Sequence, residues 1–200
     1  MRLNIKFMID TFLLALAGIP TTLKLTFVTL AFSIPIGFLL ALVKTNKKSI
    51  GKTLVTGYVS FIRGTPIVLQ ILFLYSILPS LLNYTIKEIL KLEINVFELN
   101  PIIYAYVVFI LNTTAVLSEV FRSALSAISK GQLEAALSIG LNIYQAYIRI
   151  IIPQALVSAL PNICNTTVNL LKSTSLAFMM TVKDITAIAK MNAAYGYNYI

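Results

Sequence analysis

The chain has 200 residues, of which 58% are hydrophobic and 12% are charged, and its mean hydropathy is +0.87. Soluble domains contain about 45–50% apolar and about 25% charged residues, so this composition excludes an ordinary cytosolic enzyme and a disordered chain and predicts a membrane protein. The net charge is +9. Because the basic residues lie between apolar segments, anionic membrane lipid and the positive-inside rule account for them, and no nucleic-acid partner is expected.

Residue types that carry covalent chemistry are scarce in this sequence. It contains no histidine and a single cysteine, Cys164, which excludes an internal disulfide, a Cys/His metal site and nucleophilic catalysis with an imidazole base. The tripeptide Gly51-Lys52-Thr53 matches the end of a phosphate-binding loop, but the first glycine of that motif would fall on Asn46, and no strand precedes it. We therefore expect a chain that is not an enzyme and binds no cofactor itself.

Four apolar stretches are long enough to cross a bilayer as helices, because about 20 residues span the hydrocarbon core. The predicted spans are residues 19–43, 65–82, 101–121 and 150–171. Residues 53–61 form a mixed segment that is expected at the membrane interface, and residues 122–149 are polar but prone to form helix. Residues 181–200 are too polar for a fifth span.

The charges between the spans predict the orientation of the chain. The loop after the first span carries four lysines, and the stretch after the third span carries three basic residues and one acid. The loop after the second span carries two lysines and three glutamates. Because cytoplasmic loops are enriched in Lys and Arg, the first and third loops are predicted in the cytoplasm and the N-terminus outside.

The polar stretch before the fourth span has features of a partner-binding segment. Glu134-Ala135-Ala136 is predicted to open a short helix, and Gly140 is placed to end it in a left-handed conformation. Two small alanine side chains leave a smooth helix surface, which suits the groove of another protein. A simple connection between two helices needs only about two to eight residues, so residues 122–149 are longer than a connection requires.

The same residues carry a family resemblance. The pattern E-A-A, three residues, G, nine residues and I-x-L-P is similar to the signature of binding-protein-dependent ABC importer permeases. It is formed here by Glu134, Ala135, Ala136, Gly140, Ile150, Ile152 and Pro153, with Ile152 in place of the usual leucine. Further segments resemble the polar amino acid branch of that family. They are residues 61–66 with Gln70, residues 119–122, residues 130–132 and residues 171–176.

This resemblance implies an all-α integral membrane protein, namely a type I ABC importer permease with a single transmembrane domain of about five spans. It also implies a location in the bacterial cell membrane and four kinds of partner. These are a second permease chain (identical or different), a cytoplasmic ATPase dimer that holds ATP and Mg, an extracellular substrate-binding protein, and membrane lipid. Residues 134–140 would be the site at which the ATPase docks.

The chain departs from the family pattern in two places. Family members usually have an acid where Ser173 stands, and they continue beyond residue 200 into a last membrane helix, so the fifth span is expected to be missing from this sequence. The long loop at residues 84–100 and the Ser-Ala-Leu-Pro run at residues 158–161 are most similar to cystine importers. The resemblance therefore implies a polar amino acid as substrate, with cystine favoured.

The fourth span carries a polar stripe. At 100° per residue, its members fall within an arc of about 80° opposite an apolar face. They are Ser158, Asn162, Asn165, Asn169 and Lys172. Because polar groups are costly in hydrocarbon, the stripe must face either a water-filled substrate path or other helices, where each hydrogen bond contributes about 0.6 kcal/mol. Both interpretations stay open, and Asn112 in the third span is a further candidate for the path.

Two other motifs are interpreted as structural. Glu119 and Arg122 are three residues apart and are predicted to form a local ion pair on one helical face. Arg63, Gly64 and Pro66 are predicted to break the chain before the second span and to shape the gate region. Proline suits the first turn of a helix, and the residue before it avoids the helical conformation.

Three functions are compatible with these features. A permease of an ATP-driven importer would work by alternating access, with the ATPase pushing on the helix near residues 134–140. An ion-gradient-driven transporter or channel would need a membrane carboxylate, and Glu119 is the only acid in the third span. A membrane scaffold would explain neither the polar stripe nor the importer signature. The resemblance favours the importer.

Overall fold

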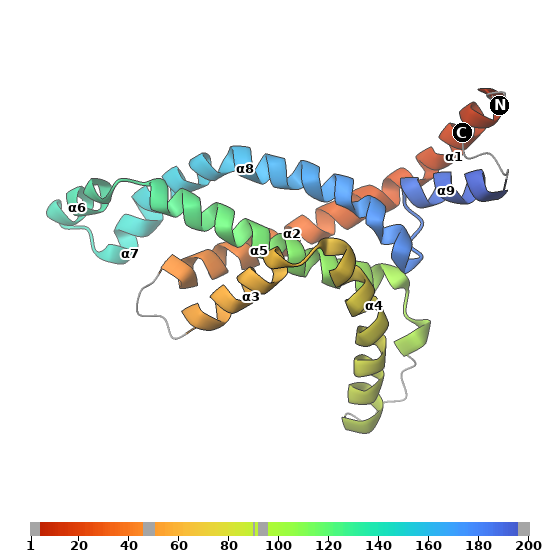
Figure 1. The fold of residues 1–200 in the computed structure, drawn as a ribbon. Helices are drawn as coiled ribbons and strands as arrows, with labels where there is room; N and C mark the ends of the chain where they lie inside the picture. The colour runs from red at the N-terminus through yellow and green to blue at the C-terminus, as the bar shows by residue number, and fades with distance from the viewer. Residues whose placement is uncertain (1–4, 46–50, 90, 92–95, 196–200) are drawn as a thin grey trace. The chain divides into compact units, whose positions relative to one another are not determined.

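The computed structural model describes residues 5–45, 51–89, 91 and 96–195 (Figure 1). Within these residues the chain is almost entirely helical and contains no strand, as the all-α prediction requires. The α-helices are α1 (Ile5–Ala15), α2 (Ile19–Thr45), α3 (Lys52–Gly64), α4 (Ile67–Tyr84), α5 (Pro101–Ala127), α6 (Lys130–Ser138), α7 (Ile143–Ala146), α8 (Ile152–Ser173) and α9 (Ile185–Tyr195). Short 3-10 or π-helical turns occupy Leu16–Gly18, Thr85–Ile89, Val96–Glu98, Tyr147–Ile151 and Thr174–Met180.

Within the described residues, four helical stretches are long and apolar enough to cross a membrane: Ile5–Thr45, Ile67–Ile89, Pro101–Ala127 and Ile143–Met180. Each contains one of the four apolar segments predicted from the sequence. The first joins α1 to α2 and has 41 residues, which at 1.5 Å per residue is about 60 Å, twice the thickness of the hydrocarbon core. With 27 residues, α2 alone is therefore long enough for the first crossing.

Several helix ends differ from the predicted ones. Helix α5 continues beyond residue 121 to Ala127, because Ala124 and Leu125 are still buried against neighbouring helices. The mixed segment expected at the membrane interface, residues 53–61, lies within a regular helix, α3 (Lys52–Gly64). Within the described residues, helix α9 has 11 residues and is not among the four stretches that are long and apolar enough to cross a membrane. Lys47, Lys48 and Glu93, on which the predicted orientation partly rests, lie outside the described residues.

The chain divides into two compact units, and α2, α5 and α8 contribute residues to both. The first unit contains Met1–Thr29, Thr65–Ile110 and Asn169–Ile200, and the second contains Leu30–Gly64 and Leu111–Val168. In the first unit, α1 packs against α9, and α4 packs against the turn Thr174–Met180. Asp184 caps α9 there, because its carboxylate accepts hydrogen bonds from the backbone N–H groups of Thr186 (3.2 Å) and Ala187 (2.8 Å).

The second unit contains a core in which α2, α5 and α8 contact one another. Its buried members are Ala41, Leu117, Phe121, Ala124, Leu125, Ile151, Ala155 and Ala159. The rings of Phe38 and Phe121 meet edge to face with their centroids 5.4 Å apart. Half of the buried members are alanines, which lets the helix backbones approach closely, as is common in membrane bundles.

The close approach of α2 and α5 depends on one glycine. A Cβ atom added at Gly37 would lie 3.0 Å from the Cβ of Leu117 and 3.3 Å from the backbone N of Ser118. Gly37 belongs to a buried stripe of small residues that recurs every three or four positions along α2 and the 3-10 turn before it. The stripe consists of Gly18, Thr22, Thr26, Thr29, Ser33, Gly37 and Ala41. Small residues at this spacing are a packing signal in membrane helices.

Helix α3 is held against α5 in the same unit. Val59 and Ile62 of α3 are buried with Ala115 of α5. The hydroxyl of Tyr58 donates a hydrogen bond to the backbone carbonyl of Leu111 at 2.6 Å. The carbonyl oxygen has two lone pairs, so it can accept this bond and a backbone hydrogen bond within α5 at the same time.

Candidate functional site

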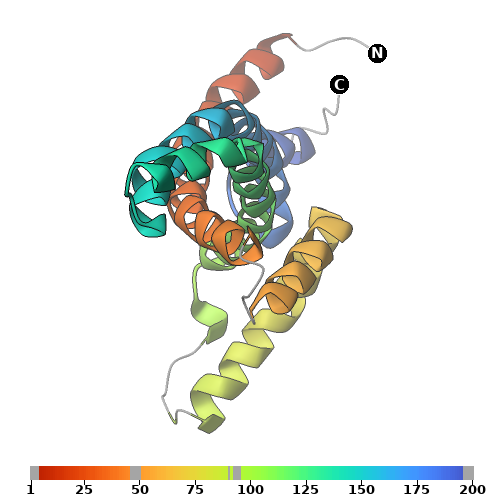
Figure 2. The ribbon, with the colours of Figure 1, turned by 90° about the vertical axis from the view of Figure 1, so that its left-hand side faces the viewer.

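The segment between α5 and α8 forms an ordered helical excursion. Helix α6 begins at Lys130, one turn before the predicted start at Glu134. The earlier start follows from Ser129, whose hydroxyl caps the helix by accepting a hydrogen bond from the N–H of Gly131 at 3.3 Å. Figure 1 shows α6 and α7 at one end of the long α5 and α8 helices, and Figure 2 views them from that end.

The end of α6 has the predicted left-handed residue. Gly140 has a φ of 87°, and its N–H donates to the carbonyl of Leu137 (3.0 Å), while the N–H of Leu141 donates to the carbonyl of Ala136 (3.2 Å). These two bonds form a Schellman motif, which requires a residue without a Cβ penalty at Gly140.

A second cap follows this turn immediately. Asn142 accepts a hydrogen bond from the N–H of Gln145 at 2.9 Å, and the Gln145 side chain accepts one from the N–H of Asn142 at 3.0 Å. This is a capping box that starts α7. The Asn-x-x-Gln spacing is the sequence signal for this cap, which was not among the predicted features. The turn between α6 and α7 is thus fixed from both sides by local hydrogen bonds.

The predicted docking residues do not all lie at the surface. Glu134, Ala135 and Gly140 are exposed, but Ala136 is buried and faces inward. The expected smooth pair of surface alanines is therefore wrong, since consecutive residues on a helix point about 100° apart.

The outer surface of this turn is instead strongly apolar, which the sequence analysis did not predict. Its large exposed side chains are Leu137, Ile139, Ile143, Tyr144 and Ile148. The side chains of Ile139 and Tyr144 are 77% and 73% exposed. Exposed apolar side chains gathered at one place mark a surface for binding another protein or a membrane.

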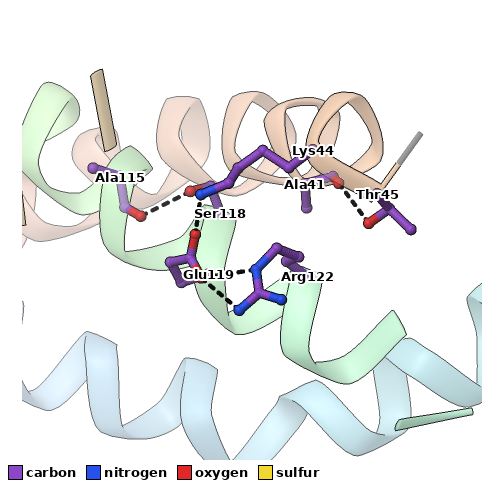
Figure 3. Close-up of polar contacts among 7 residues, drawn as sticks. All are labelled: Ala41, Lys44, Thr45, Ala115, Ser118, Glu119 and Arg122. Atoms are coloured by element: carbon purple, nitrogen blue, oxygen red, sulfur yellow. Dashed lines mark hydrogen bonds and ion pairs between the residues drawn. The ribbon is translucent and has the colours of Figure 1, made fainter. Parts of the chain in front are cut away.

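A cluster of three charged side chains, in which two ion pairs share one carboxylate, lies in the second unit (Figure 3). The predicted pair of Glu119 and Arg122 is present, with 2.8 Å between the guanidinium and the carboxylate. The structure adds Lys44 from α2, whose ammonium group contacts the other carboxylate oxygen of Glu119. One acid therefore joins two helices through two cations, and Lys44 and Glu119 are largely buried. The sequence separation of Lys44 from Glu119 left no local signal for this contact.

The polar stripe of α8 lies on an exposed face of the helix. Ser158, Asn162, Asn165, Asn169 and Lys172 are all exposed. The buried side of α8 is centred about 90° away around the helix. It consists of Ala155, Ala159, Thr166 and Leu170. A third, apolar and mainly exposed face contains Val157, Leu160, Cys164, Val168 and Leu171. Among the described residues, none buries the side chains of this stripe.

Asn112 lies in the middle of α5 and is half-buried. Its neighbours Thr113 and Thr114 are both buried, and the hydroxyl of Thr114 has no hydrogen-bond partner in the described part of the chain. The structure thus places Asn112 on the more deeply buried helix and the polar stripe on the more exposed one.

The predicted break before the second span is present. Helix α3 ends at Gly64 and α4 begins at Ile67, with Pro66 in an extended conformation just before the helix rather than in its first turn. The Gln70 side chain donates hydrogen bonds to the carbonyl and the hydroxyl of Thr65, both at 2.9 Å. Arg63 and Gly64 are exposed, and none of the described residues comes close enough to Gly64 to explain a glycine there.

The chain resembles known transport proteins over most of its length. Residues 33–199 match the family described as binding-protein-dependent transport system inner membrane components. The chain is 37% identical over 194 residues to the probable amino-acid permease protein YxeN of Bacillus subtilis, covering 97% of this chain and 82% of that relative. It is also 37% identical over 169 residues to the L-cystine transport system permease protein TcyL of the same bacterium, covering 84% of this chain and 68% of that relative.

A solved structure has the same fold. A crystal structure of an amino acid ABC transporter with histidines matches 100% of this chain and 87% of that chain, with a TM-score of 0.83 and 27% sequence identity. The named relatives are membrane permeases, not enzymes. Together with the apolar helices, these matches show that the chain belongs to the binding-protein-dependent transport family and is a multi-pass permease subunit of an amino-acid ABC importer.

Proposed function

We propose that the chain forms one half of the membrane path of an importer for polar amino acids, with L-cystine as its substrate. The family implies a cytoplasmic ATPase and a substrate-binding protein as partners. A second permease chain, identical or different, completes the path. ATP and Mg bind to the ATPase dimer and not to this chain. The N-terminus lies outside the cell, so that the segment containing α6 meets the ATPase in the cytoplasm.

The observation that carries this proposal is the surface of the turn between α6 and α7. It combines exposed apolar side chains such as Ile139 and Tyr144 with the exposed carboxylate of Glu134. A short helix with apolar anchors suits a groove on a partner protein. Its two flanking caps fix the turn before binding, so little conformational entropy is lost on docking.

Packing supports a route by which α6 would move the membrane helices. Leu133 of α6 and Tyr147 of the π-helical turn after α7 pack against the buried core of α2, α5 and α8. Ion pairs from Glu119 to Lys44 and Arg122 reinforce the same region. A push on α6 by the closing ATPase dimer would therefore be transmitted to packed helices, and alternating access follows from their movement as a body.

The polar stripe of α8 supplies the lining of the proposed path. Asn side chains both donate and accept hydrogen bonds, so Asn162 and Asn165 suit the ammonium and carboxylate groups of an amino acid. Asn112 of α5 is a further lining residue in this proposal. The second candidate, an ion-gradient-driven transporter, is disfavoured because Glu119 already pairs with two cations and is poorly placed to exchange protons or sodium.

Docking of the ATPase is tested by co-purification from native membranes. The wild-type chain carries an affinity tag, and the ATPase subunit is identified by mass spectrometry. In the variant Glu134→Arg, the reversed charge on α6 should reduce the recovered ATPase at least about fivefold. The matched control is Glu88→Arg, which reverses another exposed acid on the loop between α4 and α5. An equal loss of ATPase in Glu134→Arg and Glu88→Arg contradicts the proposal. Recovery of no ATPase with the wild-type chain contradicts it as well.

The substrate is tested by transport into proteoliposomes that contain the whole complex and its binding protein. Uptake of radiolabelled L-cystine should depend on ATP and should be competed by unlabelled L-cystine. ATP-dependent uptake of glutamine but not of cystine would support the importer function and would rule out cystine as the substrate.

A further inference from the structure

The segment that follows α8 has an unusual helical form. Residues Thr174–Met180 form a 3-10 helix of seven residues, whereas 3-10 runs longer than about three or four residues are uncommon. Thr174, Ala177 and Met180 are at most 1% exposed. Because a 3-10 helix has three residues per turn, these side chains stack on one buried face. An α-helix over the same residues would spread them over about 120° and break up that face.

Local hydrogen bonds help to hold this form. Three successive hydroxyl side chains at the end of α8 each donate to the backbone carbonyl three residues earlier. They are Ser173, Thr174 and Ser175, with donor–acceptor distances of 2.7–2.9 Å. These bonds satisfy carbonyls that the last turn of an α-helix leaves without a partner. The Ser-Thr-Ser run therefore favours a change of helical form at this point.

The run ends in a strained residue. Thr181 has a φ of 60°. Its N–H donates to the carbonyl of Phe178 (3.0 Å), and the N–H of Val182 donates to the carbonyl of Ala177 (3.3 Å). This is the same Schellman motif that ends α6, with Thr181 at the position that Gly140 occupies there. A β-branched residue is strained in this left-handed conformation, whereas glycine is not.

The residues that follow Thr181 are firmly anchored in the first unit. Asp184 is 1% exposed and caps α9. A Cβ atom added at Gly18 would lie 2.6 Å from the backbone carbonyl carbon of Asp184, so the start of α9 packs directly on the turn Leu16–Gly18. Backbone strain persists where the surrounding structure fixes it, and it is concentrated in segments that change conformation.

We propose that residues 174–181 are a conformational switch of the transport cycle. The described state is the strained one, and in the other state the run is α-helical and Thr181 leaves the left-handed region. The rise per residue falls from about 2.0 Å to about 1.5 Å on this change. Over the seven residues of the run, α9 therefore moves by about 3.5 Å relative to the end of α8. The proposal rests on the proposed function, because it assigns a moving segment to an importer that works by alternating access.

Substitutions at Thr181 separate strain from simple structure. Thr181→Gly removes the strain from the described state and disfavours the α-helical state, because glycine is a poor helix former. Thr181→Val keeps the branched side chain and removes only the hydroxyl. Lys91→Gly is the matched control, since Lys91 is the other non-glycine residue with a positive φ (53°) in the described part of the chain.

The first measurement compares stability with transport in the whole complex with its binding protein. Thr181→Gly should raise the melting temperature by about 2–4 °C, yet it should lower the rate of ATP-dependent uptake at least about fivefold, because it holds the described state. Thr181→Val should match the wild type in both, and Lys91→Gly should leave uptake unchanged. The probe is radiolabelled L-cystine or L-glutamine, whichever the wild type transports.

The second measurement follows the movement itself. In a Cys164→Ala background, spin labels at Leu171→Cys and Met191→Cys occupy exposed positions at the end of α8 and in α9. The distance between the labels should change by about 3 Å between the nucleotide-free complex and the complex trapped with vanadate. Thr181→Gly should suppress this change.

Wild-type uptake in Thr181→Gly, or an unchanged label distance in a complex that transports, overturns the switch and leaves the importer function standing. An equal loss of uptake in Thr181→Gly and Thr181→Val also overturns it, since the hydroxyl and not the strain would then matter. Absence of ATP-dependent uptake of both probes by the wild type is a different result, and it contradicts the proposed function itself.

Discussion

Helices α5 and α8 are both apolar and long enough to cross a membrane, yet they differ greatly in burial. Half of the residues in the apolar window of Pro101–Ala127 are buried within the chain, against 17% for Ile143–Met180. The one carboxylate of α5, Glu119, is paired inside the chain with Lys44 and Arg122. The polar groups of α8 face outward.

This difference indicates that α5 mainly holds the fold together, whereas α8 has exposed faces that can bind other molecules. Helix α5 contacts α2, α3 and α8 in the second unit through residues such as Leu117 and Ala115. Helix α8 uses one narrow alanine-rich face for packing, and its other faces are left for substrate, lipid or a second permease. Substitutions on α5 should therefore affect stability, whereas substitutions on the polar face of α8 should affect transport.

The largest effect on stability is expected for Glu119→Ala. This change leaves Lys44, which is 10% exposed, without its counter-charge, at a cost of about 3–5 kcal/mol. The melting temperature of a fluorescent-protein fusion, followed by gel filtration after heating, measures the effect. Lys172→Ala on α8 is the control and should leave the melting temperature nearly unchanged. Similar melting temperatures for the two variants would contradict the claim that α5 contributes more to stability than the polar face of α8.

An intermediate effect is expected where α2 and α5 meet. Gly37→Ala places a methyl group 3.0 Å from the Cβ of Leu117 and against the α5 backbone, so overpacking should cost about 1–3 kcal/mol. Gly57→Ala in α3 meets no atom within 4 Å and should be neutral or stabilising by up to about 1 kcal/mol, because alanine is a better helix former. The same melting assay compares them, and a melting temperature for Gly37→Ala at or above that of Gly57→Ala contradicts the close packing.

The smallest effect is expected for Tyr58→Phe, which removes the hydrogen bond from α3 to the Leu111 carbonyl and keeps the ring. The loss should be about 1 kcal/mol, as for a typical single hydrogen bond. Tyr84→Phe, at a side chain that is 62% exposed, is the matched control. A melting temperature equal to the control would mean that α3 is held on α5 by packing alone.

Much of the fold follows from periodicity and length. The four apolar segments and the break at Pro66 could be predicted because hydrophobic runs and proline act locally. The left-handed Gly140 could be predicted for the same reason, since a helix end is a local structure. The importer family followed from ordered short motifs rather than from physics alone.

The features that the sequence did not reveal depend on contacts between distant residues. Lys44 joins Glu119 across 75 positions, and the close contact at Gly37 exists only when α2 and α5 are packed. The inward orientation of Ala136 also follows from the packing of α6 against the rest of the chain. By contrast, the capping box of Asn142 and Gln145 is local, and its Asn-x-x-Gln spacing is visible in the sequence.

The central claim is that the polar face of α8 lines a water-filled path, and cysteine accessibility tests it most directly. In a Cys164→Ala background, Asn165→Cys and Leu160→Cys place single thiols on the polar and apolar faces of the same helix. In the intact complex in membranes, a charged, membrane-impermeant thiol reagent should modify the cysteine at position 165 at least about tenfold faster than the one at 160, because thiols in lipid stay protonated and unreached. Trapping the ATPase with vanadate should change the rate at position 165 alone. Equal rates at the two positions, or no modification at position 165 in either state, would contradict the account.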